Sequence, residues 1–264
     1  MASTKSINLI SASSQYLSIT DGDQTGLDLG SDFTIEGDYK VASTPTSGQA
    51  FEMFDKYLST GNQRSYRFFY QNSGGTMQII IGTSSNGEAG GVKNHAFNYT
   101  LSTRTWYHIA MTYDLSAGTA ELFINSSSQG TVASGNTSIH NGTAEVNLGS
   151  VNDGTALYWN GKMFNTRVWG DIRTDQEILD NYQAYVASDA DNLISNWQYN
   201  DDLLDETTNN NDLTNNGTAL FNADIPAWAA VTTDIKSVNS LAKASVKSIK
   251  GLAIADVKSI NGLE

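Results

Sequence analysis

The sequence of 264 residues contains no cysteine, only three histidines and only two prolines. Without cysteine, the chain cannot form disulfides, thiolate zinc sites, iron–sulfur clusters or a cysteine nucleophile. The histidines, His95, His108 and His140, do not stand at metal-ligand spacings, which argues against a histidine-rich metal site. Nucleotide-binding glycine motifs and the nucleophile-elbow motif are also missing, so most enzyme classes are disfavoured.

Basic residues are scarce as well, with 15 Lys and Arg against 28 Asp and Glu and a net charge of −13. Such an acidic chain does not suit a phosphate backbone, so we predict no nucleic-acid partner. No run approaches the roughly 20 apolar residues of a membrane helix, so we predict no membrane insertion. The first residues lack the apolar core of a secretion signal, which favours assembly inside a host cell or export by a non-Sec route.

Alternating apolar and polar residues dominate the first 230 positions, a pattern typical of strands with one buried face. In the segment 33–41, apolar residues alternate with Glu36, Asp38 and Lys40, and we predict that these three form a solvated face. Further strands are predicted at 15–19, 65–71, 76–82, 106–113, 119–125, 144–148, 161–169 and 193–199. Glycine- and asparagine-rich turns between them indicate an all-β fold, a two-sheet antiparallel jelly-roll sandwich.

One short helix interrupts the predicted strands. Thr174 and Glu177 have the spacing of a capping box, and Ile178, Tyr182 and Tyr185 follow as one apolar stripe. We predict a helix that covers an edge of the sandwich.

Four segments, 13–19, 29–36, 105–125 and 160–169, together with this helix, resemble a laminin G-like, concanavalin A-like jelly-roll domain. The resemblance covers about 7–228 and implies the same fold. It leaves the function open, because the fold hosts lectins, glycosidases and structural modules. It also implies that a structural calcium ion is a candidate cofactor.

A glycosidase of this fold is expected to carry closely spaced carboxylates on one strand, in the pattern Glu-x-Asp-x-Glu. The nearest match is Glu36-Gly37-Asp38, where Lys40 replaces the third acid. We therefore predict no catalytic residues and a protein that is not an enzyme.

Two kinds of binding site are predicted instead. Tyr158, Trp159 and Asn160 lie in a loop and could form an aromatic platform for carbohydrate, with core packing as the alternative. Two acidic loops could offer oxygen ligands to calcium, with turn hydrogen bonding as the alternative. The candidate calcium ligands are Asp21, Asp23, Asp28, Asp201, Asp202 and Asp205.

The C-terminal tail, 229–264, contains three copies of an 11-residue unit, beginning at Ile235, Val246 and Val257, the last of them shortened. Glycines and β-branched residues favour short strands linked by turns over a long helix. A tail this small cannot bury its own apolar residues, so we predict an assembly anchor that needs a partner surface. The anchor residues are Ile235, Val238, Leu241, Val246, Ile249, Leu252, Val257, Ile260 and Leu263.

The repeats resemble C-terminal repeats of bacteriophage or uncultured-bacterial surface proteins. The sequence thus predicts a jelly-roll domain, 1–228, displayed outward by the repeat tail, 229–264. The leading hypothesis is a non-catalytic structural or adhesion protein at a virion surface, such as a capsid decoration or tail-fibre component. Its partners would be other subunits of a homo-oligomer or of the capsid or tail assembly, with surface glycans as a further partner. The alternative is a carbohydrate-binding lectin, soluble and extracellular or at the cell surface; a glycoside hydrolase ranks last.

Overall fold

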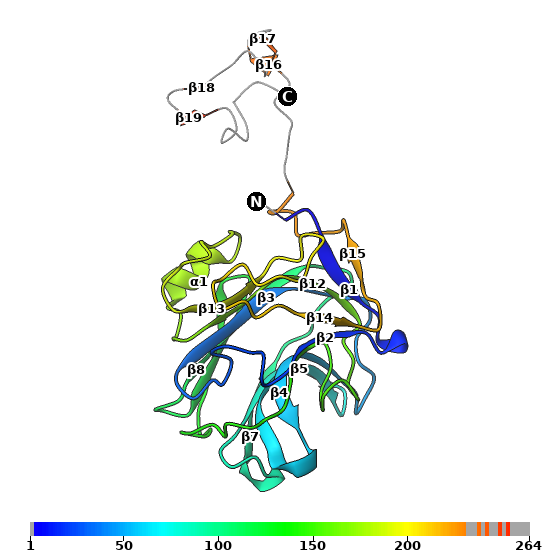
Figure 1. The fold of residues 1–264 in the computed structure, drawn as a ribbon, viewed down its shortest axis with the longest axis vertical. Helices are drawn as coiled ribbons and strands as arrows, with labels where there is room; N and C mark the ends of the chain where they lie inside the picture. The colour runs from blue at the N-terminus through cyan, green and yellow to red at the C-terminus, as the bar shows by residue number, and fades with distance from the viewer. Residues whose placement is uncertain (1–2, 231–236, 239–240, 243–247, 250–251, 254–264) are drawn as a thin grey trace. The chain divides into compact units, whose positions relative to one another are not determined.

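The computed structural model describes residues 3–230 and four two-residue strands in the tail, at 237–238, 241–242, 248–249 and 252–253. The chain divides into two compact units, Met1–Ala229 and Ala230–Glu264. In the first unit, two antiparallel sheets pack face to face, as Figure 1 shows. This confirms the predicted all-β sandwich with one helix.

The larger sheet has eight strands in the order β10-β9-β8-β3-β12-β1-β15, and β13 pairs with the end of β12. Its strands are β1 (Ser6–Leu9), β3 (Phe33–Val41), β8 (Tyr107–Asp114), β9 (Thr119–Ile124), β10 (Ser127–Val132), β12 (Gly161–Trp169), β13 (Leu193–Trp197) and β15 (Leu220–Asn222).

The smaller sheet has seven strands in the order β14-β2-β11-β4-β5-β6-β7. Its strands are β2 (Tyr16–Ile19), β4 (Ala50–Leu58), β5 (Gln63–Ser73), β6 (Thr76–Ser84), β7 (Val92–Asn98), β11 (Val146–Leu148) and β14 (Thr214–Asn216). Short 3-10 turns occupy Ser11–Ser13, Thr60–Asn62 and Ala89–Gly91. Every strand predicted in the first unit is present, whereas β1, β4, β7, β10, β14 and β15 were not predicted.

Aromatic side chains fill the space between the sheets. Trp197 is fully buried and packs against Phe54 at a centroid distance of 6.1 Å. Its indole N–H donates to the Asn211 carbonyl at 2.7 Å, which satisfies the one polar atom of the buried ring. Phe33 stacks on Tyr113 at 5.4 Å and so joins β3 to β8.

The helix α1 (Asp175–Asn181) forms where the capping box predicted it. The Thr174 hydroxyl accepts from the Glu177 N–H at 3.3 Å, and the Glu177 carboxylate accepts from the Thr174 N–H at 2.8 Å. Ile178 is buried against Ala110 and Phe123. These two residues belong to β8 and β9, so α1 covers the outer face of the eight-stranded sheet rather than an edge of the sandwich. Among the described residues, no helix is both long and apolar enough to cross a membrane.

In the tail, β16 (Ser237–Val238) pairs with β17 (Leu241–Ala242), and β18 (Ser248–Ile249) pairs with β19 (Leu252–Ala253), both antiparallel. The two pairs occupy equivalent positions of the first two repeats, which confirms the predicted short strands. Four anchor residues, Val238, Leu241, Ile249 and Leu252, lie in these strands. The other five, Ile235, Val246, Val257, Ile260 and Leu263, lie outside the described residues.

Candidate functional site

The predicted solvated face of β3 is wrong for two of its three residues. Glu36 is 1% exposed and Asp38 is 2% exposed. Glu36 pairs with Ala110, against which Ile178 of α1 is buried, so it lies on the sheet face that α1 covers. Pro226, Ala227 and Trp228 line the same cavity as Asp38. Lys40, nearer the sheet's rim, reaches the Asp224 carboxylate at 2.8 Å.

Glu36 is held as an ionised carboxylate by one ion pair and two hydrogen bonds. The Arg167 Nε lies 3.0 Å from Oε1, the Trp169 indole donates to Oε1 at 2.7 Å, and His108 Nε2 donates to Oε2 at 3.1 Å. Burial alone would raise the pKa of Glu36, but the Arg167 charge and the His108 and Trp169 hydrogen bonds hold it at about 2. The Arg167 guanidinium also donates to the Asn181 carbonyl at the end of α1. This network therefore fixes the helix on the sheet.

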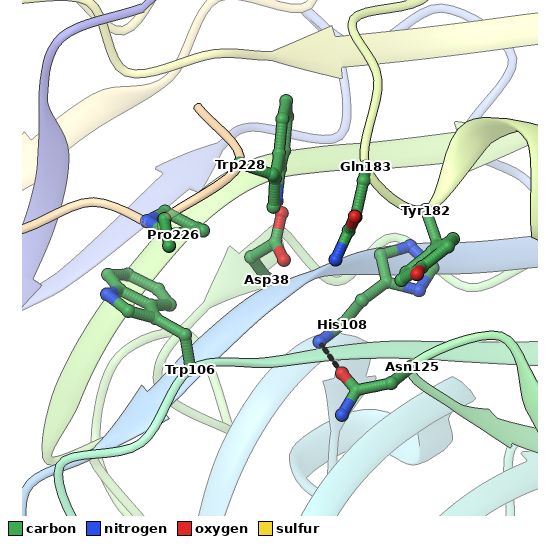
Figure 2. A pocket seen from close by; sticks show the side chains of 9 residues that line it. Asp38, Trp106, His108, Asn125, Tyr182, Gln183, Pro226 and Trp228 are labelled. Atoms are coloured by element: carbon green, nitrogen blue, oxygen red, sulfur yellow. Dashed lines mark hydrogen bonds between the residues drawn. The ribbon is translucent and has the colours of Figure 1, made fainter. Parts of the chain in front are cut away.

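Asp38 lies next to this network but opens into a cavity of about 410 Å³, which we name the Trp pocket (Figure 2). Its buried carboxyl lies against the Trp228 indole. Burial raises the pKa of Asp38 to about 6, against the opposing charges of His108 and Arg167. The pocket is lined by Asp38, Trp106, His108, Asn125, Tyr182, Gln183, Pro226, Ala227 and Trp228.

Two half-buried indoles form apolar walls of the Trp pocket. Trp106, placed just before β8, lies edge-on to Phe164 at 6.4 Å, and Trp228 lies edge-on to the same ring at 5.7 Å. Trp228 also packs on Tyr185 at 5.2 Å. Because Phe164 is fully buried on β12, it holds both indoles in position. Trp106 was predicted as the first residue of a strand, whereas the structure places it just before β8, at the pocket.

Amide side chains complete the lining of the Trp pocket. Asn125 follows β9, and its Oδ1 atom accepts from the His108 backbone N–H at 3.0 Å, which leaves its NH₂ group without a partner among the described residues. Gln183 follows α1 and points into the cavity from the opposite side. Both side chains are exposed, so they can bind a ligand without losing an internal hydrogen bond.

Of the predicted aromatic platform, Trp159 lies in the core, which was the alternative. Trp159 is fully buried and packs edge-on against Tyr39 at 5.7 Å, so it cannot stack on a ligand. Tyr158 and Asn160 line a separate cavity of about 490 Å³. The Tyr158 hydroxyl donates to the Gly154 carbonyl at 2.6 Å, so this hydroxyl is already hydrogen-bonded within its own loop.

Two carboxylates of the first acidic loop bind a lysine ammonium of the chain instead of a metal ion. Lys56 is fully buried, and its ammonium contacts the Asp21 carboxylate, lies 3.3 Å from Asp28 Oδ1 and donates to the Ala144 carbonyl at 2.9 Å. Asp23 turns away and accepts from the Thr20 hydroxyl at 2.6 Å.

The second acidic loop uses its carboxylates locally. Asp205 accepts from the Asn196, Thr207 and Asn211 backbone N–H groups, at 2.9, 3.0 and 3.1 Å. Asp201 lies 3.7 Å from the Lys5 ammonium, and Asp202 is half-buried. Within residues 3–230, no three His, Asp or Glu side chains are grouped to hold a metal ion.

We therefore expect a chelator to leave the melting temperature of the protein unchanged. We also expect Lys56→Met to lower the free energy of unfolding by roughly 1–3 kcal/mol. The loss arises because the Ala144 carbonyl loses its donor and two partly exposed carboxylates lose their counter-charge. Thermal unfolding with and without EDTA, and of the variant, measures both effects. A fall in melting temperature on chelation that added calcium reverses would instead establish a calcium site.

Comparisons with known proteins agree with this architecture. The laminin G family described as the concanavalin A-like lectin/glucanases superfamily matches residues 11–179. The chain belongs to this family. No curated protein matches it.

Among solved structures, a candidate carbohydrate-binding protein from Bacteroides ovatus ATCC 8483 aligns with a TM-score of 0.63 and 16% identity. The alignment covers 84% of this chain and 60% of that one, so the chain spans only part of that protein. A heptameric SAP-like pentraxin from Limulus polyphemus aligns with a TM-score of 0.57 and 14% identity, covering 82% of this chain and 94% of the pentraxin. At such identities the likeness concerns the fold.

Proposed function

We propose that this laminin G family member binds a saccharide in the Trp pocket. The observation that carries the proposal is the meeting of two indoles, a buried carboxyl and two exposed amides around one cavity. A sugar ring presents an apolar C–H face that packs on an indole and hydroxyls that need directional partners. Asp38, Asn125 and Gln183 supply acceptors and donors for such hydroxyls.

The size of the cavity and the fold are consistent with this proposal. A volume of about 410 Å³ lies within the range of about 300–1,000 Å³ that is usual for small-molecule sites. A carbohydrate-binding module of the Ruminococcus gnavus IT-sialidase, bound to α2,6-sialyllactose, aligns over 67% of this chain and 98% of that one. Its TM-score is 0.50 and its identity 16%, so it supports the general suitability of the fold and no residue role.

The proposed activity is binding without catalysis. Glu36, the carboxylate nearest to the glycosidase pattern, is buried against Arg167, Trp169 and His108, and it helps to fix α1 on the sheet. A retaining glycosidase needs two accessible carboxyl groups on either side of the scissile bond. In the Trp pocket only Asp38 could take such a role.

We also propose that the repeat tail attaches this binding domain to a larger assembly, such as a virion surface. The three repeats and the paired strands in two of them support this proposal. The outward display of a saccharide-binding domain would then bring the assembly to glycans on a cell surface.

Trp228→Ala is expected to weaken saccharide binding about tenfold or more, because a stacked ring contributes about 1 kcal/mol beyond the area it buries. A glycan array identifies a ligand for the full chain, and titration calorimetry compares the variants. Tyr158→Ala, in the separate cavity, is the matched control and should bind as the native chain does. Loss of binding in Tyr158→Ala but not in folded Trp228→Ala would move the site to the Tyr158–Asn160 loop.

A further inference from the structure

A second, smaller cavity adjoins the Trp pocket. It has a volume of about 210 Å³ and is lined by Lys40, Arg104, Lys162 and Asp224. Trp106 stands between the two cavities, because its ring lines the Trp pocket while its indole N–H donates to Asp224 Oδ1 at 3.2 Å. A ligand that extends from the Trp pocket past Trp106 therefore reaches the second cavity.

The second cavity has an excess of positive charge. Lys40 and Lys162 place their ammonium groups 2.8 and 3.1 Å from Asp224 Oδ2. With Arg104, three cations face one carboxylate, which leaves a local formal charge of +2. A cluster of basic residues is unexpected in this domain, because residues 1–230 contain only 10 basic side chains against 25 acidic ones. Three of those ten basic residues line this one cavity.

Arg104 is the cation most available to a ligand. It is exposed, and among the described residues its side chain has no ion-pair partner. Its backbone is fixed, because its N–H donates to the Val41 carbonyl at 2.8 Å and its φ is +60°, in the left-handed region that non-glycine residues seldom adopt. A guanidinium presents two parallel donors, which match the paired oxygens of a carboxylate or a sulfate.

We infer that the saccharide bound in the Trp pocket is acidic, with a carboxylate or sulfate group that sits in the second cavity against Arg104 and Lys162. This inference rests on the proposed function. The ligand would be a short oligosaccharide with one or a few negative charges. A long polyanion is disfavoured, because its further charges would face a domain whose net charge over 1–230 is negative.

The test compares matched probes on the full chain. Sialyllactose is paired with lactose, a galacturonic acid trisaccharide with its carboxyl-reduced form, and a sulfated disaccharide with its desulfated form. In at least one pair we expect the acidic member to bind at least tenfold more tightly, with affinity falling as salt is added. The pair that responds identifies the anionic group.

Arg104→Gln and Lys162→Gln should each weaken binding of the acidic probe about threefold to tenfold and leave the neutral partner unchanged. Lys93→Gln, an exposed change of equal charge on β7 of the other sheet, is the control and should change neither. Equal binding of both members of every pair, lost in Trp228→Ala but not in Arg104→Gln, would overturn the inference and keep the saccharide site. Absence of binding to every probe and to a glycan array would overturn the proposed function itself.

Discussion

Arg167→Met is expected to lower the free energy of unfolding by about 3–5 kcal/mol, as judged by urea denaturation. The change would leave the Glu36 carboxylate buried without its principal counter-charge, and an unpaired buried ion costs more than the pair contributes. The Asn181 carbonyl would also lose the donor that ties the end of α1 to the sheet.

The double variant Glu36→Gln/Arg167→Met separates the charge effect from lost packing. If the unpaired charge is responsible, the double variant should recover a large part of the stability that Arg167→Met loses. A single-variant loss below about 1 kcal/mol would contradict the buried ion pair.

The pH dependence of stability provides a second check. Since the folded pKa of Glu36 is depressed to about 2, the stabilisation from its ionised form is present above pH 4.5 and is lost as pH falls toward 2.

Alternation in the sequence predicts which residues of a strand share a face, but not what covers that face. The segment 33–41 was predicted as β3 with correct bounds, yet Glu36 and Asp38 proved buried. Their cover comes from α1 and from residues 224–229, which lie more than 130 positions away in sequence. Long-range packing of this kind leaves no local pattern in the strand itself.

An irregular strand was harder to predict. In β4, the pairing with β5 shifts between Glu52 and Phe54, so Met53 is an extra residue that breaks the alternation. As a result, Glu52 and Asp55 end on one face although three positions separate them. Burial raises the pKa of Glu52 to about 7 in spite of Arg67 beside it, and burial likewise raises the pKa of Asp55. A period-2 search cannot find such a pair.

The Trp pocket was not predicted, because the search for strands used only local patterns in the sequence. The pattern treats Trp106 as the first residue of the strand 106–113 and gives Trp228 no role. The two indoles meet because both pack on Phe164. For the first acidic loop the composition did indicate a cation, but the cation is the buried ammonium of Lys56.

Removal of the tail after Ala229 is expected to abolish assembly and to leave a folded, monomeric domain. The nine anchor residues would each contribute roughly 1.5–3 kcal/mol if fully buried, whereas ordering the backbone costs about 1–2 kcal/mol per residue. For a tail of this length the cost of ordering the backbone exceeds the gain from these side chains, so stable order needs a partner surface. Strand addition from another chain supplies backbone hydrogen bonds together with apolar cover.

Charge favours the same outcome. Residues 231–264 contain five Lys against three acidic residues, whereas residues 1–230 have a net charge of −15. The tail of one copy is therefore attracted to the domain of another, and assembly should weaken as salt is added. Size-exclusion chromatography with light scattering compares the full chain with the truncated one, and unfolding curves confirm that the domain stays folded. The chain is cut after Ala229 because this residue is buried in the domain. A truncated chain that self-associates as the full chain does, or a full chain that is monomeric at every concentration, would refute an anchor between copies of this chain.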